Sequence, residues 1–167
     1  MKIIIPVAGE GTRLRPYTHT VPKALLEIAG KPIIEHILDC LTGLPRVEEY
    51  VIIVGHLGDR IRSHIEKRRP RLPVRFVQQN EFHGLGHALS LAGPHAGDGE
   101  NLIVLGDTIF EADLRRVVAG RVPALGVMKV ADPRRFGVVE MRGKRVVRLY
   151  EKPAHPKSNL ALVGIYY

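Results

Sequence analysis

The sequence predicts an α/β fold with three layers, in which a mostly parallel sheet lies between helices and a β-hairpin is inserted. Three observations support this prediction. Short apolar runs alternate with helical patterns from the N-terminus to about Val130. Most of these runs are apolar throughout, which is typical of strands covered on both faces. After Val130 the alternation stops, and two β-type runs follow one another directly.

The strands of the parallel sheet are predicted from runs of apolar and β-branched residues, and the helices from apolar residues at a helical period. The predicted strands are Lys2–Val7, Tyr50–Val54, Val74–Gln78, Leu102–Leu105 and Ala124–Val130. The predicted helices are Pro32–Leu41, Asp59–Arg68, Gly86–Ala92 and Glu111–Ala119. Pro32 suits the first turn of its helix, and Gly43 follows that helix's end. The segment Pro94–Gly99 is expected to be a surface turn.

The inserted hairpin is predicted from two further β-type runs, Gly137–Met141 and Arg145–Tyr150, which are joined by Arg142-Gly143-Lys144. A last strand is expected at Ala161–Tyr167. No repeat or linker divides the chain, so residues 1–167 are predicted to form a single domain. A chain of about this length buries roughly 68–70% of the surface that it exposes when unfolded.

Composition limits the classes of function. The net charge of +8 permits nucleic acid, membrane surfaces or small polyanions as partners, and charge alone does not choose between them. No apolar run approaches the roughly 20 residues of a membrane span, and no signal-peptide pattern begins the chain. The single cysteine, Cys40, excludes an internal disulfide, so a cytoplasmic location is expected. Cys40 itself is expected to pack in the core.

The loop after the first strand carries the strongest chemical signal. Gly9–Arg13 is rich in glycine, whose backbone N–H groups approach a phosphate closely and form an anion-binding nest. Arg13, Arg15 and Lys23 add positive charge suited to a polyphosphate. The alternative is an ordinary glycine- and proline-rich turn with solvated arginines. Ligands of open α/β sheets lie beyond the carboxyl ends of the strands, where Gly106-Asp107-Thr108 is also expected.

Five segments, in order along the chain, resemble the sugar-phosphate nucleotidylyltransferases, and most closely the glucose-1-phosphate thymidylyltransferases. They read "PVAGEGTRLRPYTHTVPKALLEIAGKPII", "QNEFHGLGHAL", "VLGDTIF", "ADPRRFGVVE" and "YEKPAHPKSNLALVGIYY". The resemblance implies a Rossmann-like sheet of the nucleotide-diphospho-sugar transferase type. It also implies an enzyme that transfers a nucleotidyl group from a nucleoside triphosphate, with dTTP favoured, to a sugar 1-phosphate, with glucose 1-phosphate favoured. The products are an NDP-sugar and pyrophosphate, and Mg²⁺ is the implied cofactor.

The resemblance also implies the residues of a nucleotide site. Backbone groups of Ala8, Gly9, Gly11 and Thr12 would hold the nucleotide, and Gln79 and Gly84 would contact its base. A glutamine amide offers a donor and an acceptor, which matches a pyrimidine imide edge. Arg13 would bind the β- and γ-phosphates and stabilise departing pyrophosphate, and Lys23 would reach the α-phosphate.

The remaining implied site residues are Asp107 and four residues on the sugar-phosphate side. Asp107 would hold Mg²⁺, although a helix N-cap is the alternative for this residue. The sugar-phosphate side is formed by Gly137, Glu151, Lys152 and Leu162. Lys152 would hold the 1-phosphate, and Glu151 would accept hydrogen bonds from sugar hydroxyls. The implied catalytic set is therefore Arg13, Lys23, Asp107 and Lys152.

Several alternatives stay open. Family members continue beyond the position of Tyr167, so this chain is expected to lack a C-terminal part that supplies a second metal carboxylate and subunit contacts. Activity of this chain alone and a homo-oligomeric state are therefore open. A UTP–glucose-1-phosphate uridylyltransferase is one alternative, and a non-catalytic module that senses nucleotides or sugar phosphates is another. Small-molecule substrates are the expected partners, without nucleic acid or membrane. Nucleic acid is disfavoured because the basic segment 67–71 lies at a helix end and has no aromatic residues for base stacking.

Overall fold

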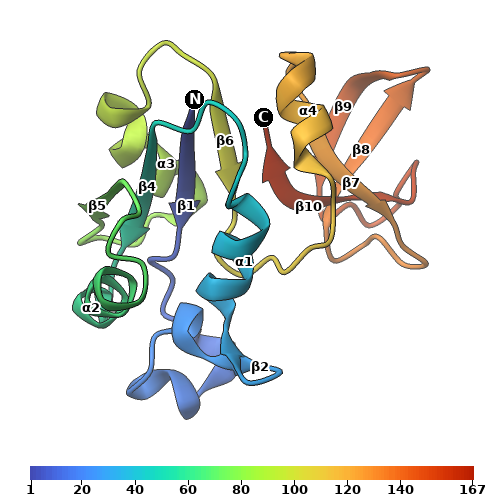
Figure 1. Cartoon of the computed structure of the whole chain (residues 1–167). Coiled ribbons are helices and arrows are strands. Elements are labelled where there is room, and N and C mark those ends of the chain that lie inside the picture. The colour runs from blue at the N-terminus through green and yellow to red at the C-terminus, as the bar shows by residue number, and fades with distance from the viewer. The chain divides into compact units, whose positions relative to one another are not determined.

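The computed structural model describes all residues, Met1–Tyr167, and they group into two compact units (Figure 1). The first unit contains Met1–Val122 together with Tyr167, and the second contains Pro123–Tyr166. None of the four α-helices combines the length and the apolar character that crossing a bilayer requires.

A parallel sheet with the strand order β5-β4-β1-β6 forms the centre of the first unit. Its strands are β1 (Lys2–Pro6), β4 (Glu49–Val54), β5 (Val74–Gln78) and β6 (Asn101–Val104). Ile3, Ile4 and Ile5 of β1 alternate between the two faces, yet all are buried, so the sheet is covered on both sides. The mixed α/β class predicted from the fully apolar runs is confirmed, and each predicted strand lies within two residues of its observed bounds.

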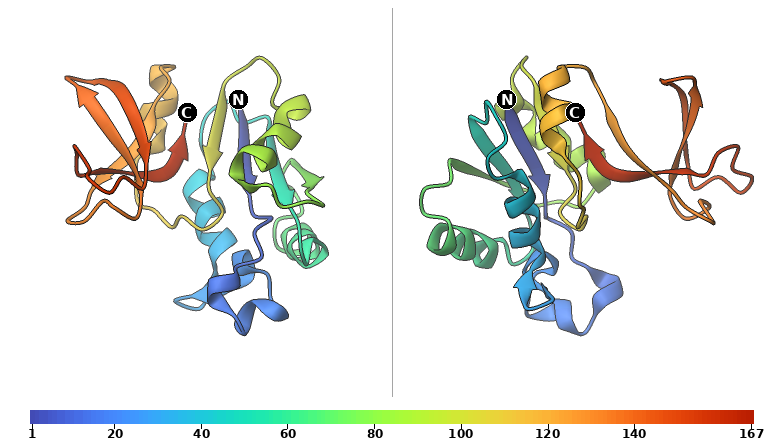
Figure 2. Two further views of the ribbon diagram at one scale, coloured as in Figure 1. Left: turned by 180° about the vertical axis from the view of Figure 1, so that it is seen from behind. Right: turned by 45° about the vertical axis from the view of Figure 1, so that its right-hand side comes forward.

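Helices cover this sheet on both faces. The first unit contains four α-helices, α1 (Ile33–Leu41), α2 (Gly58–Arg68), α3 (Gly84–Ala96) and α4 (Leu114–Gly120). Ala88 and Ala92 of α3 pack against Ile4 and against Val51 and Ile53 of β4. α1 lies in front of the strands in Figure 1, whereas α3 is nearer the viewer in the rear view of Figure 2.

Two of the expected local features differ from the structure. The surface turn expected at Pro94–Gly99 is confined to residues 97–99, because α3 passes through Pro94 and ends at Ala96. A proline close to a helix end removes one backbone hydrogen bond without disrupting many turns, and Gly97 leaves the helix with a positive φ of 65°.

The expected burial of Cys40 in the core is also wrong, because Cys40 is exposed. Its thiol donates a hydrogen bond to the carbonyl oxygen of Phe110 at 3.3 Å. The buried face of α1 is made by its aliphatic residues, and these leave no core position for the cysteine. They are Ile33, Ile34, Ile37, Leu38 and Leu41.

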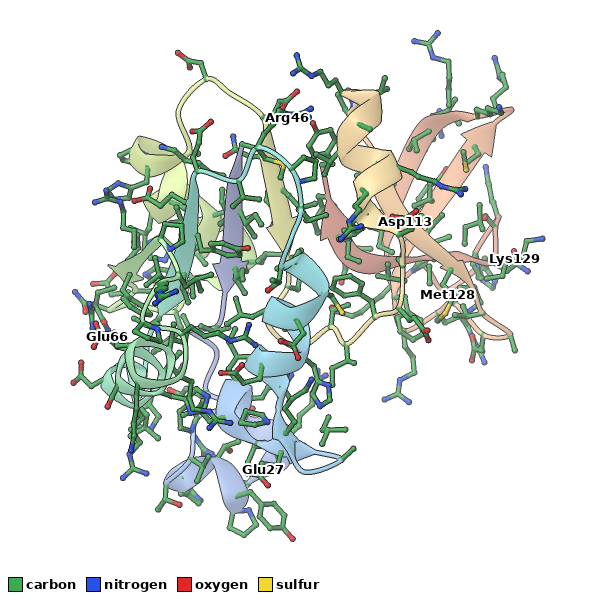
Figure 3. The ribbon with its side chains drawn as sticks, viewed as in Figure 1. Glu27, Arg46, Glu66, Asp113, Met128 and Lys129 are labelled. Carbon is green, nitrogen blue, oxygen red and sulfur yellow. The ribbon has the colours of Figure 1, made fainter.

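An ion-pair network joins α1 to the end of α2. Glu35 is only 5% exposed, and its Oε2 accepts a hydrogen bond of 2.9 Å from Nε of Arg69. Its Oε1 lies 3.0 Å from the ring of His64, and Arg69 also bonds to Asp39. Hydrogen bonds from Lys31 and from Arg69 lower the pKa of Asp39 below its ordinary value. Other charged side chains point away from the core, as Glu66 of α2 does in Figure 3.

Between β1 and α1 the chain forms three short 3-10 helices and a small ribbon rather than regular structure. The 3-10 helices are η1 (Thr12–Leu14), η2 (Tyr17–His19) and η3 (Lys23–Leu25), and the ribbon pairs β2 (Glu27–Ile28) with β3 (Lys31–Pro32). The five prolines and glycines from Pro6 to Pro22 account for the absence of longer helices or strands there.

The second unit is an antiparallel sheet with the order β7-β10-β8-β9. Its strands are β7 (Leu125–Lys129), β8 (Gly137–Arg142), β9 (Arg145–Glu151) and β10 (Leu160–Tyr166). The predicted hairpin is confirmed: Arg142 pairs with Arg145 across a turn in which Gly143 has a positive φ of 61°. A type of turn that needs positive φ favours glycine at this position.

Candidate functional site

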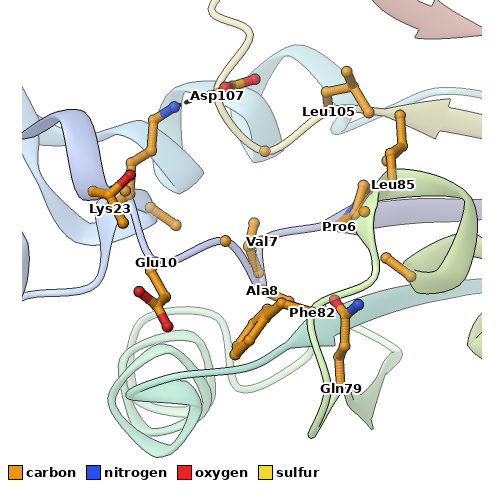
Figure 4. Close-up of a pocket in the computed structure, with 17 residues that line it drawn as sticks. Pro6, Val7, Ala8, Glu10, Lys23, Gln79, Phe82, Leu85, Leu105 and Asp107 are labelled. Atoms are coloured by element: carbon orange, nitrogen blue, oxygen red, sulfur yellow. Dashed lines mark hydrogen bonds and ion pairs between the residues drawn. The ribbon is translucent and has the colours of Figure 1, made fainter.

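A cavity of about 650 Å³ lies beyond the carboxyl ends of β1 and β6 in the first unit. The strand order reverses between these two strands, and open α/β sheets bind ligands at such a position. Figure 4 shows side chains from three segments converging on the cavity. It is lined by Pro6, Val7, Ala8, Gly9, Glu10, Gly11, Thr12, Lys23, Ala24, Gln79, Phe82, Gly84, Leu85, Ala88, Leu105, Gly106 and Asp107.

The first lining segment depends on glycine at position 11. Gly11 has a positive φ of 65°, and its carbonyl accepts a hydrogen bond of 2.9 Å from Oγ1 of Thr18. A Cβ at this position would lie 2.9 Å from Cγ2 of Thr18 and 3.2 Å from Cβ of Lys23. The loop therefore folds tightly against the segment that carries Lys23, which places the ammonium group at the cavity.

Two further glycines, Gly106 and Gly55, lie very close to the backbone at the end of β1. A Cβ on Gly106 would lie 2.6 Å from the carbonyl oxygen of Pro6 and 2.3 Å from Cγ1 of Val7. A Cβ on Gly55 would lie 2.6 Å from the carbonyl oxygen of Ala8. Only a residue without a side chain allows this backbone packing, so the strand ends meet closely enough to form one cavity floor.

Charged groups occupy one end of the cavity. Nζ of Lys23 lies 2.7 Å from Oδ2 of Asp107, and this ion pair links the loops after β1 and β6 (Figure 4). Asp107 is not a helix N-cap: α4 begins at Leu114, and Asp113 is its cap, accepting a hydrogen bond from the backbone N–H of Arg115. The sequence alternative for Asp107 is thus excluded.

Arg13 differs from the other predicted nucleotide residues in its position. It lies in η1, is exposed, and is not among the residues that line the cavity. Glu10, which the sequence prediction did not include, does line the cavity and bonds to Arg15 at 3.0 Å. The structure therefore brings together Ala8, Gly9, Gly11, Thr12, Lys23, Gln79, Gly84 and Asp107.

The other end of the cavity is largely apolar. Phe82 and Leu85 line it although 46% and 42% of their surfaces are exposed, and Ala88 of α3 lies beside them. Sequence reasoning missed these residues. The available signal was the presence of large apolar residues on either side of Gly84 in a polar loop. A cavity with charges at one end and an apolar wall at the other suits a ligand with a phosphate group and a flat ring system.

Gln79 is the polar group at the apolar end. It is 4% exposed, and its backbone N–H donates to the carbonyl of Val54 at 2.8 Å. Its side-chain Nε2 lies 3.1 Å from Nδ1 of His87 on α3. Burial and the backbone hydrogen bond therefore hold Gln79 at the cavity floor, and the contact with His87 holds its side-chain amide.

The second unit gathers the four residues predicted on the sugar-phosphate side. Gly137 pairs with Glu151 in the hairpin, and a Cβ on Gly137 would lie 2.9 Å from Cδ1 of Leu162. Lys152 has a positive φ of 42°, and its backbone N–H donates to the carbonyl of Phe136 at 3.1 Å. Its ammonium lies 2.7 Å from Oε1 of Glu151, and both side chains are largely exposed. Cationic and acceptor groups thus occupy one end of the hairpin.

At the cavity, Asp107 is the residue whose carboxylate fits Mg²⁺. No group of three or more His, Cys, Asp or Glu side chains is placed to hold a metal ion. Asp107 supplies one exposed carboxylate. Mg²⁺ is commonly held by one or two carboxylates together with substrate phosphates and waters, so this donor set fits an ion shared with a bound phosphate.

Comparison with known proteins gives a consistent result. The family model described as "Nucleotidyl transferase" matches residues 2–167. The bifunctional protein GlmU of Methanocaldococcus jannaschii is 39% identical over 99% of this chain and 39% of its own length. A glucose-1-phosphate thymidylyltransferase of Streptomyces antibioticus is 36% identical over 100% of this chain and 49% of its own length. The UTP–glucose-1-phosphate uridylyltransferase AglF of Haloferax volcanii is also 36% identical, over 99% of this chain and 71% of its own length.

Among solved structures, a protein of Bacillus anthracis assigned as a glucose-1-phosphate thymidylyltransferase, in complex with sucrose, matches with a TM-score of 0.89. The two chains are 31% identical, and the match covers 99% of this chain and 70% of that one. The present chain therefore spans less than half the length of the GlmU and Streptomyces relatives, whereas it spans most of the Bacillus chain.

Proposed function

This chain belongs to the nucleotidyl transferase family, and on that premise we propose that it transfers a nucleotidyl group to a sugar 1-phosphate. The favoured substrates are dTTP and glucose 1-phosphate. The observation that carries this proposal is the cavity of the first unit, which has the Lys23–Asp107 pair at one end and Phe82 with Gln79 at the other. Such a cavity offers separate environments for a triphosphate and for a base.

In the proposed reaction a phosphate oxygen of the sugar 1-phosphate attacks the α-phosphorus of the nucleoside triphosphate. A new P–O bond forms, the bond from the α-phosphorus to the bridging oxygen breaks, and pyrophosphate leaves with that electron pair. No covalent enzyme intermediate is needed, so the protein acts mainly by positioning and by neutralising charge.

The proposed roles of the basic residues follow from this reaction. Lys23 neutralises charge at the α-phosphate, and the bidentate guanidinium of Arg13 binds the departing pyrophosphate. Because Arg13 is exposed on η1 and does not line the cavity, it acts on phosphates that extend beyond the cavity toward solvent. Lys152, which is 59% exposed in the second unit, holds the 1-phosphate of the acceptor, and Glu151 accepts hydrogen bonds from the sugar.

Asp107 is the residue that would hold Mg²⁺, with substrate phosphates as further ligands. When bound, the ion neutralises phosphate charge and orients the phosphates. In its absence the carboxylate is neutralised by Lys23 at 2.7 Å, so binding of the triphosphate involves the separation of this pair.

Both thymine and uracil fit the proposed base contacts, because each presents the same imide edge to Gln79. The names of the relatives include a thymidylyltransferase and a uridylyltransferase. We favour dTTP, with UTP as the alternative, because the "DPRRFGVVE" segment resembles the thymidylyl type more closely.

The experiment is a pyrophosphate-release assay with glucose 1-phosphate and Mg²⁺ across dTTP, UTP, ATP, CTP and GTP. Release with dTTP, and more weakly with UTP, is expected. Lys23→Met is the matched negative variant, since it removes the charge while keeping most of the side-chain length. Tight nucleotide binding without release would favour a sensing module. A melting temperature unchanged by every nucleotide would contradict the proposal, since a ligand that binds the folded state must stabilise it.

A further inference from the structure

One histidine outside the cavity contacts the only buried polar side chain within it. His87 lies on α3 and is not a lining residue, yet its Nδ1 is 3.1 Å from Nε2 of Gln79. Gln79 lines the cavity and is 4% exposed. The two residues are eight positions apart and come from different elements, because Gln79 follows β5 and His87 lies in the first turns of α3.

The chemistry of this contact determines the orientation of the amide. An amide nitrogen only donates hydrogen bonds, so Nδ1 of His87 must accept, and the ring proton of the neutral histidine is on Nε2. With its nitrogen held by His87, the amide directs Oε1 of Gln79 to the opposite side. No donor of the chain bonds to Oε1, and this oxygen is not sealed from the cavity. Figure 4 shows the amide below Pro6 with its oxygen and nitrogen on opposite sides.

We propose that His87 is a positioning residue that fixes the Gln79 amide so that the site selects pyrimidines carrying an N3–H group. This inference rests on the proposed function and adds to it the physical basis of base choice. If the side-chain amide of Gln79 were free to rotate by 180°, it could present either its oxygen or its nitrogen to the base. It would therefore accept from the N3–H of uracil or thymine, or donate to the bare N3 of cytosine. With Nε2 directed at His87, Oε1 is the amide atom left to face the base, which favours the first option.

His87 also contacts a second histidine, His83. The ring of His87 is half-buried and meets the ring of His83 edge-on, with 5.1 Å between the ring centroids. His83 is exposed and does not bond to Gln79. His83 in turn bonds to Glu81 at 2.9 Å. This pair of histidines provides a matched comparison, because one contacts the amide and the other does not.

The test compares dUTP with dCTP, which share the same sugar and ring size and differ at N3 and C4. Dissociation constants for both nucleotides are measured by calorimetry on the full chain, for wild type and for His87→Leu, His87→Asn and His83→Leu. Wild type is expected to prefer dUTP. His87→Leu is expected to reduce this preference on the order of 10-fold, because the amide is no longer fixed. In His87→Asn, Oδ1 replaces Nδ1 as the acceptor, so this variant and His83→Leu are expected to keep the preference within about 3-fold.

Three results would overturn the inference: no preference for dUTP in wild type, an unchanged preference in His87→Leu, or a loss in His87→Asn as large as in His87→Leu. Nitrogen NMR of the free protein supplies an independent readout, since a neutral His87 protonated on Nδ1 would contradict the assigned hydrogen bond. Failure of the proposed function is distinguishable, because wild type would then bind none of dTTP, dUTP and dCTP, whereas failure of this inference leaves wild-type binding intact.

Discussion

The ammonium of Lys23 and the carboxylate of Asp107 are 2.7 Å apart at one end of the cavity, although 84 positions separate them in the chain. The two residues come from the loops that follow β1 and β6, which are neighbouring parallel strands. The same two groups are proposed to meet the α-phosphate and Mg²⁺. In the free protein the two charges therefore neutralise each other. When the substrate binds, its phosphate must replace Asp107 beside Lys23, and Mg²⁺ must replace Lys23 beside Asp107.

Asp107→Asn is expected to strengthen the binding of metal-free dTTP by roughly 3–10-fold, because removing the carboxylate frees Lys23 and eliminates repulsion worth about 1 kcal/mol in a solvated site. With Mg²⁺ present the same variant is expected to bind dTTP no better than without it. Calorimetry with and without EDTA measures both effects. Weaker metal-free binding by Asp107→Asn than by wild type would contradict the competition between carboxylate and phosphate.

Arg13→Ala is expected to lower kcat by roughly 10²–10³-fold, the scale for loss of one preorganised charge that stabilises a transition state. The control is Arg116→Ala on α4, whose side chain is 89% exposed and pairs only with Asp113. Steady-state pyrophosphate release measures both variants. Near-normal turnover of Arg13→Ala would remove this arginine from the mechanism.

Phe82→Ala is expected to raise the KM for the nucleotide about 10-fold, at the lower end of the range for losing one base–aromatic stack, while kcat changes little. The reason is that an apolar wall contacts the base equally in the ground state and the transition state. Tyr17→Ala is the matched control, since Tyr17 is an exposed aromatic residue of the same unit that does not line the cavity. A fall in kcat with an unchanged KM would argue against a wall that only binds the base.

Gly11→Ala is expected to destabilise the protein by about 1–2 kcal/mol, because alanine resists positive φ and its Cβ would press on Thr18 and Lys23. Gly93→Ala is the contrasting change. A Cβ there meets nothing within 4 Å, and alanine favours the helix by up to about 1 kcal/mol, so this variant should be neutral or more stable. Chemical denaturation measures both. Equal effects of the two substitutions would show that the Gly11 conformation is not required.

Asp39→Asn is expected to lower the Tm by roughly 1–2 °C at neutral pH, since an ion pair with a half-exposed carboxylate contributes only about 0.5 kcal/mol. Hydrogen bonds from Lys31 and Arg69 lower the pKa of Asp39 from 3.8, so the stabilisation is present above the unfolded-state pKa. It is lost as the pH falls through the lower folded-state pKa. Thermal melts of both proteins should therefore differ by a constant amount above about pH 5 and converge in stronger acid. A difference that grows toward acid pH would contradict this sign.

Local patterns in the sequence were sufficient to predict the elements and the class of fold. Apolar runs of strand length and helical periods depend on neighbouring residues, so β5 was predicted at its observed bounds, Val74–Gln78. The helix ends were less accurate, because α3 continues through Pro94 under the influence of packing against Ile4 and Val51 rather than local propensity. Cys40 was placed wrongly for a related reason. A helical pattern identifies the buried face of a helix, but it does not decide whether a residue at the edge of that face is buried or exposed.

The sequence alone also indicated the chemistry of the loop after β1, through its glycines, arginines and Lys23, and its resemblance to the nucleotidylyltransferases predicted the family. Only the tertiary structure established that Lys23 pairs with Asp107, that Phe82 and Leu85 form an apolar wall, and that His87 holds Gln79. These relationships join residues from different elements. They arise when parallel strands place distant loops at one edge of the sheet, and no spacing along the chain encodes which atoms then meet.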